Sequence, residues 1–194
     1  LMVEEEVFAL FSYVGTPTTV KIIPLVEKAQ IPLVGMFTGA NALRDPFNRY
    51  IINVRASYYQ ETEAAVRAFV ENLGFKRIAV FYQYDAYGFD GLKGTELALK
   101  DYGLTPVARG TYKRGTSDVE EGLEEILNSE AEAVIMIGTY EPCAKFIRLA
   151  RERGSTAAFL GVSFVGAEAL ALLLNDDEKG VYLTQVVPPP ESPE

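Results

Sequence analysis

The sequence predicts an α/β fold in which parallel sheets are covered on both faces by helices. Short runs rich in β-branched and aromatic residues alternate with amphipathic segments of helical spacing. Residues 77–83 and 133–138 are almost continuously apolar, as is typical of strands that are buried on both faces. Three of the expected helices run into a glycine, at Gly74, Gly103 and Gly154, a residue that readily ends a helix.

The expected elements follow one another along the chain. An apolar, aromatic run stops at Gly15, and Pro17 suits the first position of the helix that follows, with Thr16 as its N-cap. Ser57 is expected to cap a second, longer helix. Strands are expected at residues 7–14, 31–36, 48–54, 77–83, 105–112, 133–138, 159–162 and 180–186. Helices are expected at residues 17–30, 58–73, 89–102, 119–128, 141–153 and 166–174.

Two lobes and a tail are expected. Residues 1–56 supply three strands of an N-terminal lobe, and residues 57–186 supply the strand–helix steps of a C-terminal lobe. Residues 187–194 are rich in proline and acidic, which is typical of an exposed end or a linker. The opening LMVEEE has no signal-peptide pattern and resembles the end of a helix, so the chain is expected to be a fragment of a longer protein.

Composition argues against several classes of function. The formal net charge of −9, from 18 basic and 27 acidic residues, argues against a nucleic-acid partner. There is no histidine, and Cys143 is the single cysteine, so a Ser-His-Asp or Cys-His nucleophile cannot be built from this chain. Cys143 is expected to be a small buried hydrophobe. Without a GxGxxG or GxxxxGK[ST] motif or a convergent carboxylate cluster, no cofactor and no metal are expected.

Five strand-to-helix turns are candidates for a ligand site, because ligands of parallel sheets bind beyond the carboxyl ends of the strands. These turns combine hydroxyls, glycines and aromatics, and they lie at residues 12–19, 36–40, 83–88, 138–142 and 162–166. The helix that starts after the first turn favours an anion through its free amides and its dipole. For each turn, the alternative is a plain helix cap or a buried aromatic.

Six motifs occur along the chain in a recognisable order: FALFSYVGTPTT, PLVGMFTGANALR, IINVRASYYQE, RIAVFYQYDAYGFDGL, IMIGTYEPCAKFIRLAR and FLGVSFVG. Together they resemble the type I periplasmic solute-binding proteins of the leucine/isoleucine/valine-binding kind, which serve ABC importers. The resemblance covers nearly the whole chain and implies two α/β lobes with the ligand in the cleft between them. Because family members are considerably longer, it also implies a partial N-terminal lobe and a near-complete C-terminal lobe.

The resemblance further implies which residues bind the ligand. Two turns of the N-terminal lobe would hold an α-carboxylate and an α-amino group, and aromatics of the C-terminal lobe would close over them. The implied residues are Tyr13, Val14, Gly15, Phe37, Thr38, Gly39, Tyr87, Tyr140, Ser163 and Phe164.

Ser163 is a departure from the family pattern. Family members commonly place an acidic residue there, which pairs with the ligand ammonium. A buried ammonium without such a partner is costly. The ligand is therefore expected to be an amino acid held differently, or a carboxylic acid without an α-amine, whose apolar body Phe37 and Phe164 would suit.

Three functions are compatible with these patterns. The favoured one is non-catalytic binding of a small amino acid or related carboxylate, with an ABC permease as the membrane partner and a periplasmic or extracellular location. The second is a ligand-sensing extracellular domain of a signalling receptor. The least favoured is an α/β enzyme that uses Glu61, Asp85 and Glu141 as acid or base. Because a partial lobe leaves a sheet edge and an apolar face open, the isolated chain is expected to self-associate.

Overall fold

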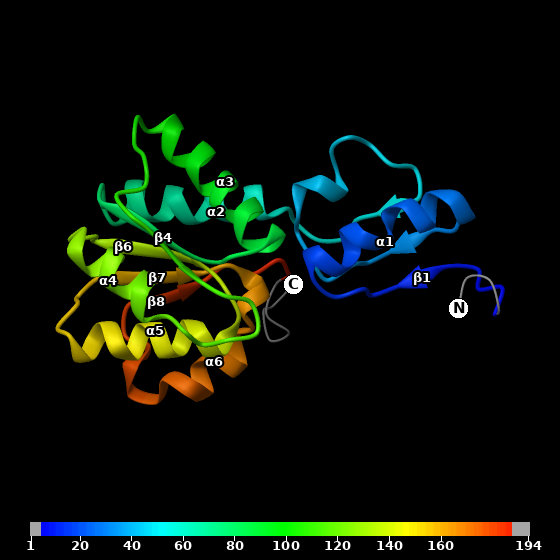
Figure 1. Ribbon diagram of the computed structural model, residues 1–194. Helices are drawn as coiled ribbons and strands as arrows, with labels where there is room; N and C mark the ends of the chain where they lie inside the picture. Colours follow the sequence, from blue (N-terminus) through cyan, green and yellow to red (C-terminus); the bar gives the residue numbers. More distant parts are fainter. Residues whose placement is uncertain (1–4, 188–194) are drawn as a thin grey trace, which may run out of the picture.

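The computed structural model describes residues 5–187 and contains two parallel sheets, each with its own helices (Figure 1). The first sheet has the strand order β1-β2-β3, and the second has the order β5-β4-β6-β7-β8. We call the first sheet with helix α1 the first lobe, and the second sheet with helices α2 to α6 the second lobe. The observed architecture is the α/β class of parallel sheets that the sequence predicts.

The bounds of the elements are as follows. The strands are β1 (Leu10–Phe11), β2 (Leu33–Val34), β3 (Ile51–Ile52), β4 (Ile78–Gln83), β5 (Arg109–Tyr112), β6 (Ala133–Ile137), β7 (Ala158–Gly161) and β8 (Val181–Leu183). The α-helices are α1 (Thr16–Ala29), α2 (Tyr58–Arg67), α3 (Ala86–Asp101), α4 (Glu120–Asn128), α5 (Tyr140–Glu152) and α6 (Ala167–Leu174). A π-helical segment, η2 (Ala68–Asn72), continues α2, and the 3-10 segments are η1 (Asn41–Leu43), η3 (Ser163–Val165) and η4 (Asn175–Glu178). Almost all of the predicted tail lies outside the described residues.

Helices cover both faces of the second sheet (Figure 1). Alternate residues along β4 enter different cores, as the period of a strand requires. Val80 and Tyr82 join the core that contains residues of α2 and α3, whereas Phe81 joins the core of α4, α5 and α6. Cys143 is fully buried in this latter core, as the sequence predicts. Burial on both faces explains why these strands are almost continuously apolar.

The first sheet is covered on one face only. A row of residues that pair across the three strands is buried beneath Val26 of α1, and this row consists of Leu10, Leu33 and Ile51. The next row along the strands is directed to the opposite face and consists of Phe11, Val34 and Ile52. In this row Phe11 is 72% exposed and Ile52 is 46% exposed. The sheet therefore presents an apolar face that no helix of the described chain covers.

The strands of the first lobe are shorter than the sequence predicts. Within residues 7–14 the pairing is limited to β1 and an isolated bridge between Val14 and Phe37, because Ser12 takes a positive φ of 55° that interrupts the extended backbone. Gly35, with φ 63°, ends β2 in the same way. β3 can pair only along the two residues that β2 offers, so the predicted strand at residues 48–54 is also too long.

Two predicted helix starts need correction, and one is confirmed. The N-cap of α1 is Gly15, with φ 89°, rather than Thr16, which is the first helical residue. Helix α3 begins three residues earlier than predicted, because the carboxylate of Asp85 accepts from the amides of Tyr87 and Gly88 at 2.9 and 3.3 Å. Ser57 caps α2 as predicted, in a reciprocal pair of hydrogen bonds with Gln60.

Candidate functional site

The two predicted binding turns of the first lobe are joined directly to each other. The amide of Phe37 donates to the carbonyl of Tyr13 at 2.7 Å, and the amide of Gly15 donates to the carbonyl of Phe37 at 3.1 Å. The structure thus brings residues 13–15 and 37–39 together, as the resemblance implies. Because the Gly15 amide already donates to Phe37, an anion at the start of α1 would have to bind the free backbone amides of the residues after Gly15.

The hydroxyls of these two turns satisfy each other. Thr16 Oγ1 lies 2.7 Å from Thr38 Oγ1, and both side chains are buried. Thr38 Oγ1 also accepts from the amide of Ala40 at 3.2 Å. The pair of hydroxyls is a hydrogen-bonding group within the first lobe that a ligand could use in place of the present bond.

Gly39 lies against the segment that leads from the first lobe into the second. The amide of Tyr58 donates to the carbonyl of Gly39 at 2.8 Å. A Cβ atom at position 39 would lie 2.8 Å from the Tyr58 nitrogen and 2.9 Å from the Ala56 oxygen, both closer than real Cβ contacts. The glycine therefore permits a close approach of two backbone segments, which is a structural role for a residue that the resemblance assigns to the ligand.

Four aromatic side chains form a continuous cluster between the lobes, and we call Phe37, Phe164, Tyr87 and Tyr58 the interlobe aromatic cluster. The centroids of the Phe37 and Phe164 rings lie 5.2 Å apart, and those of Phe164 and Tyr87 lie 4.8 Å apart. Tyr58 continues the cluster at 5.1 Å from Tyr87. Phe37 comes from the first lobe and Phe164 from η3, so the predicted pair of phenylalanines meets across the junction.

The two tyrosines of this cluster are buried phenols. Burial raises the pKa of Tyr87 well above its usual value, and the Tyr87 hydroxyl lies 3.3 Å from the carbonyl oxygen of Gly138, to which it donates. Burial also raises the pKa of Tyr58 to about 12, against smaller lowering effects of Thr38 and the Gly39 backbone. Both phenols are therefore protonated at neutral pH and can act as hydrogen-bond donors.

Arg55 lies beneath the cluster. Its guanidinium carbon is 4.6 Å from the centroid of the Phe37 ring, a cation–π geometry. Its Nη2 donates to Ser163 Oγ. Its carbonyl in turn accepts from Arg44 Nη2 at 2.5 Å. Arg55 therefore connects the first lobe with the end of strand β7 in the second.

Glu61 supplies a carboxylate beside Ser163. Glu61 Oε2 accepts from the amide of Ser163 at 2.8 Å and from the hydroxyl of Thr184 at 2.5 Å. Glu61 Oε1 lies 3.8 Å from Arg55 Nη2. We call Arg55, Glu61, Ser163 and Thr184 the buried polar network. An acidic side chain, which the family pattern places at position 163, is thus present nearby on α2 as Glu61, but it already pairs with Arg55.

Asp90 makes a second polar contact between the lobes. Both of its carboxylate oxygens lie 3.1 Å from the amide nitrogen of Asn41, which donates to them. Burial raises the pKa of Asp90 to about 6, although the Asn41 hydrogen bonds and the charge of Arg44 act in the opposite direction.

The side chains of three predicted site residues, Tyr13, Val14 and Tyr140, form none of the ring contacts and side-chain hydrogen bonds described above. Val14 and Tyr140 are exposed, Val14 beside the junction of the two turns and Tyr140 at the start of α5. Tyr13 is partly buried and packs against the core that joins α1 and the first sheet to residues of α2 and α3. Whether any of the ten residues contacts a ligand stays a prediction.

Sequence reasoning missed Arg55 and Thr184 as members of a site, and it considered Glu61 only as a catalytic acid or base. The sequence placed Arg55 only beside the lobe boundary at residues 56 and 57. Thr184 carried no signal of its own.

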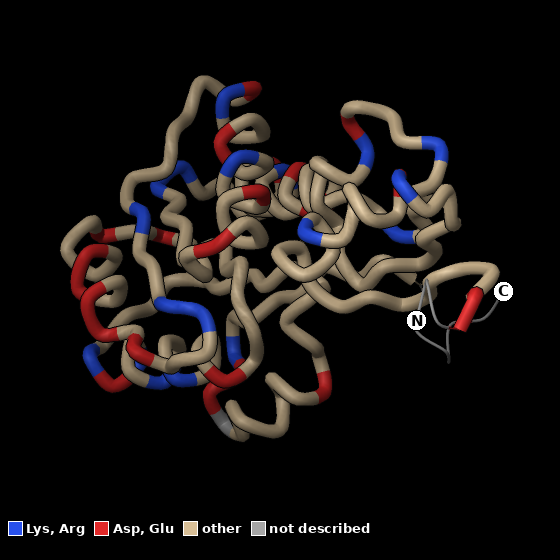
Figure 2. Tube along the Cα trace, turned by 45° about the vertical axis from the view of Figure 1, so that its right-hand side comes forward, with Lys and Arg blue, Asp and Glu red and all other residues tan. Residues whose placement is uncertain are grey.

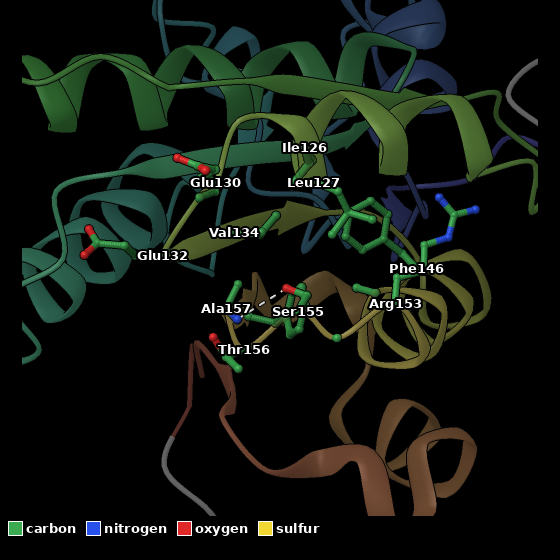
Figure 3. Close-up of a pocket in the computed structure, with 14 residues that line it drawn as sticks. Ile126, Leu127, Glu130, Glu132, Val134, Phe146, Arg153, Ser155, Thr156 and Ala157 are labelled. Carbon is green, nitrogen blue, oxygen red and sulfur yellow. Dashed lines mark hydrogen bonds between the residues drawn. The ribbon is translucent and has the colours of Figure 1, made fainter.

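Other parts of the described chain offer less for chemistry. Within residues 5–187 there is no group of three His, Cys, Asp or Glu side chains that could hold a metal ion, and no helix is long and apolar enough to cross a membrane. Acidic and basic positions are interspersed along the trace (Figure 2). A pocket of about 440 Å³ lies at the amino ends of β6 and β7, between residues such as Glu132, Val134 and Ala157 (Figure 3). It is at the sheet edge opposite to the interlobe aromatic cluster.

Comparison with known proteins decides the family. A family model described as Periplasmic binding protein matches residues 1–194, the whole chain. The chain belongs to the periplasmic binding protein family. Its two α/β lobes with parallel sheets are accordingly those of a type I periplasmic binding protein.

Three relatives illustrate the membership in this family. The structure of a possible leucine/isoleucine/valine-binding protein from Rhodopirellula baltica is 45% identical, with a TM-score of 0.93 over 99% of this chain and 53% of that one. A substrate-binding periplasmic protein from Ralstonia solanacearum is 32% identical, with a TM-score of 0.90 over 97% of this chain and 53% of that one. An amino acid binding protein from Pseudomonas aeruginosa is 30% identical over 117 residues, which is 59% of this chain and 31% of the relative. The chain thus spans about half the length of the solved relatives that it matches, or less in the last case.

Proposed function

We propose that this periplasmic binding protein binds a small amino acid or related carboxylate between its two lobes and presents it to an ABC-type importer, without chemical change. The observation that carries the proposal is the interlobe aromatic cluster, in which Phe37 of one lobe meets Phe164 of the other beside the Thr16 and Thr38 hydroxyls. An apolar surface next to a few polar groups, at the carboxyl ends of parallel strands, is the usual composition of a small-molecule site.

Ligands of more distant relatives support this class of ligand. A branched-chain amino acid ABC transporter protein from Thermus thermophilus, 20% identical, was solved with bound valine. A solute-binding protein of an ABC transporter from R. palustris, 18% identical, was solved in complex with 4-hydroxybenzoate. Both ligands carry a carboxylate on an apolar body, and only valine carries an ammonium group.

Binding would proceed by a hinge motion of the lobes about the segment near Arg55. Ligand stabilises whichever arrangement it contacts more extensively, and this difference in affinity is what a permease in the membrane would sense. The family name supports a periplasmic or extracellular location. A sensing receptor would use the same binding step, so the importer is distinguished from it by the membrane protein that the parent gene cluster encodes.

The experiment is a thermal-shift panel with the common amino acids and with small aromatic and branched carboxylic acids. A ligand at one hundred times its dissociation constant stabilises the folded state by about 2.7 kcal/mol. The expected result is a raised melting temperature with at least one carboxylate of this set, and mass spectrometry should recover the ligand unchanged. No rise in melting temperature with any compound of the panel, or conversion of a ligand into a product, would contradict the proposal.

Phe164→Ala provides the site variant for this panel, and Phe89→Ala provides a matched control. Phe89 is an aromatic of the same size whose ring contacts Tyr82 and Tyr84 and no member of the interlobe aromatic cluster. The Phe164 variant is expected to lose most of the ligand-induced shift, whereas the Phe89 variant should retain it. Equal loss in both variants would mean that the shift reports general stability and not binding at the junction.

A further inference from the structure

The buried polar network contains side-chain atoms without hydrogen-bond partners. Within the described residues, four buried side-chain nitrogen or oxygen atoms have none, and they are Arg55 Nε, Arg55 Nη1, Tyr58 Oη and Glu61 Oε1. Three of the four belong to the Arg55–Glu61 ion pair, and Tyr58 belongs to the neighbouring interlobe aromatic cluster. Buried polar groups almost always have partners, so a local group of unpartnered ones needs an explanation.

Burial makes these atoms costly to leave unpaired. The side chain of Arg55 is 8% exposed and that of Glu61 is 3% exposed. An arginine is always charged, and its desolvation is offset only when its donors are satisfied. Here only Nη2 is engaged, by Ser163 Oγ and, at longer range, by Glu61.

The unpartnered atoms are mostly donors. Nε carries one hydrogen and Nη1 carries two, and the phenol of Tyr58 can donate a further one. Against these stands one unpartnered acceptor, Glu61 Oε1, because Glu61 Oε2 already accepts from Ser163 and Thr184. What would complete the set is a group rich in acceptors and poor in donors. A carboxylate fits this description, and an ammonium group does not.

We infer that Arg55 is a specificity-determining residue of the proposed binding site, and that its unpartnered donors receive a carboxylate oxygen of the ligand. The inference rests on the proposed function and goes beyond it by naming the residue that selects the chemical class. Glu61 is a positioning residue in this scheme, because Ser163 and Thr184 fix its carboxylate, which in turn holds Nη2 of Arg55.

The position of Phe37 explains how a ligand reaches these donors. Phe37 stacks on the guanidinium and is 47% exposed, and its other contact in the cluster is with Phe164 of the second lobe. Separation of the lobes breaks the contact between the two rings and uncovers Arg55 from the side of the junction. An apolar ligand body between the two rings then places its carboxylate beside the guanidinium.

The test compares acids with their amides, because an amide keeps the size and shape of the acid but loses its charge. Isothermal titration measures the binding of 4-hydroxybenzoate, 4-hydroxybenzamide, valine and valinamide to the 194-residue chain. The variants are Arg55→Gln, which removes the charge, Arg55→Lys, which keeps the charge without the planar fork, and Arg109→Gln as control. Arg109 forms an exposed ion pair with Glu96, outside the site.

The wild-type chain is expected to prefer an acid over its amide, and Arg55→Gln should reduce this preference by about tenfold to a hundredfold, the range for a hydrogen bond to a charged group. Arg55→Lys should keep part of the preference, and Arg109→Gln should keep all of it. The preference is a ratio of affinities within one variant, so a general loss of stability does not mimic the result.

Two negative outcomes are distinguishable. If the wild-type chain binds neither these four probes nor any acid of the thermal-shift panel, both the proposed function and this inference are overturned. If the wild-type chain prefers an acid and Arg55→Gln prefers it to the same extent, Arg55 has a structural role only, and the inference alone is overturned.

Discussion

The backbone amide of Asn41 donates to both carboxylate oxygens of Asp90, each at 3.1 Å, and so joins η1 of the first lobe to α3 of the second. The carboxylate is partly buried, and its charged neighbour is Arg44. Asp90 in turn contributes to the raised pKa of the nearby Tyr59, after the larger effect of burial. Desolvation outweighs the favourable contacts, which is why the pKa of Asp90 is raised to about 6.

This raised pKa predicts a specific pH dependence. Because the folded state binds the Asp90 proton more tightly than the unfolded state does, the stabilising contribution is complete below about pH 4 and is lost as the pH rises through about 6. Asp90→Asn keeps an acceptor for Asn41 without the charge. The melting temperature of this variant relative to wild type should be higher at about pH 7.5 than at about pH 4.

Glu132→Gln is a control for which the opposite pH dependence of stability is expected. The amides of Lys76 and Arg77 donate to Glu132 and lower the pKa of its carboxyl. Its contribution is therefore present at neutral pH and lost on acidification, so this variant should be less stable than wild type at about pH 7.5, with a difference that shrinks toward acid pH. A difference for Asp90→Asn that does not vary with pH would show that the buried carboxylate is not responsible.

Gly39 should tolerate no side chain. A Cβ there meets the backbone of Tyr58 and Ala56, neither of which is a flexible side-chain end. Gly39→Ala should destabilise the fold by roughly 1–3 kcal/mol, as overpacking does, and Gly39→Val should cost more. Urea denaturation measures both.

Gly154 is the control position for the substitutions of Gly39. It has φ 80°, and no atom lies within 4 Å of the place that a Cβ would take, so its substitutions strain the backbone but meet no neighbour. Alanine and serine should therefore cost about the same at Gly154, whereas the cost at Gly39 should grow with side-chain size. A flat series at Gly39 would mean that the two backbone segments can separate freely.

Local patterns in the sequence located the strands and helices of the second lobe, although β5 and β8 are shorter than the predicted residues 105–112 and 180–186, and they overestimated the length of every strand of the first lobe. Strand β4 is flanked on both faces by helices, so its apolar run is continuous and visible in the sequence. Strand β1 is cut short by the positive φ of Ser12, which no composition rule signals.

The sequence also predicts the backbone turns of the candidate site better than its side-chain contacts. The turns at residues 13–15 and 37–39 could be located because glycine and hydroxyl residues at strand ends have a local meaning. The contact of Glu61 with Ser163 and Thr184 joins residues more than a hundred positions apart, so only the folded chain reveals it.

Two ion pairs of different burial should differ greatly in their effect on stability. Glu61 and Arg55 have side chains that are 3% and 8% exposed, whereas Glu96 and Arg109 are 32% and 45% exposed. Glu61→Ala leaves Arg55 buried without a counter-ion and should cost about 3–5 kcal/mol. Glu96→Ala should cost roughly 0.2–1 kcal/mol. Similar losses in chemical denaturation would indicate that water reaches the Arg55 guanidinium in the folded chain.

The bare face of the first sheet predicts self-association of the isolated chain. Phe11, Val34 and Ile52 form an apolar row across all three strands, and parallel sheets are normally buried on both faces. Light scattering should therefore show a mass that rises with protein concentration. Phe11→Ser combined with Ile52→Thr should shift the chain toward the monomer, because the two substitutions remove most of the exposed apolar area of the row.

Leu172→Ser is the control, since Leu172 is also highly exposed but lies on α6, far along the chain from this sheet. If Leu172→Ser abolishes association and the double variant does not, the contact between copies involves the second lobe and not the apolar row. A wild-type chain that stays monomeric at every concentration would contradict the prediction of self-association.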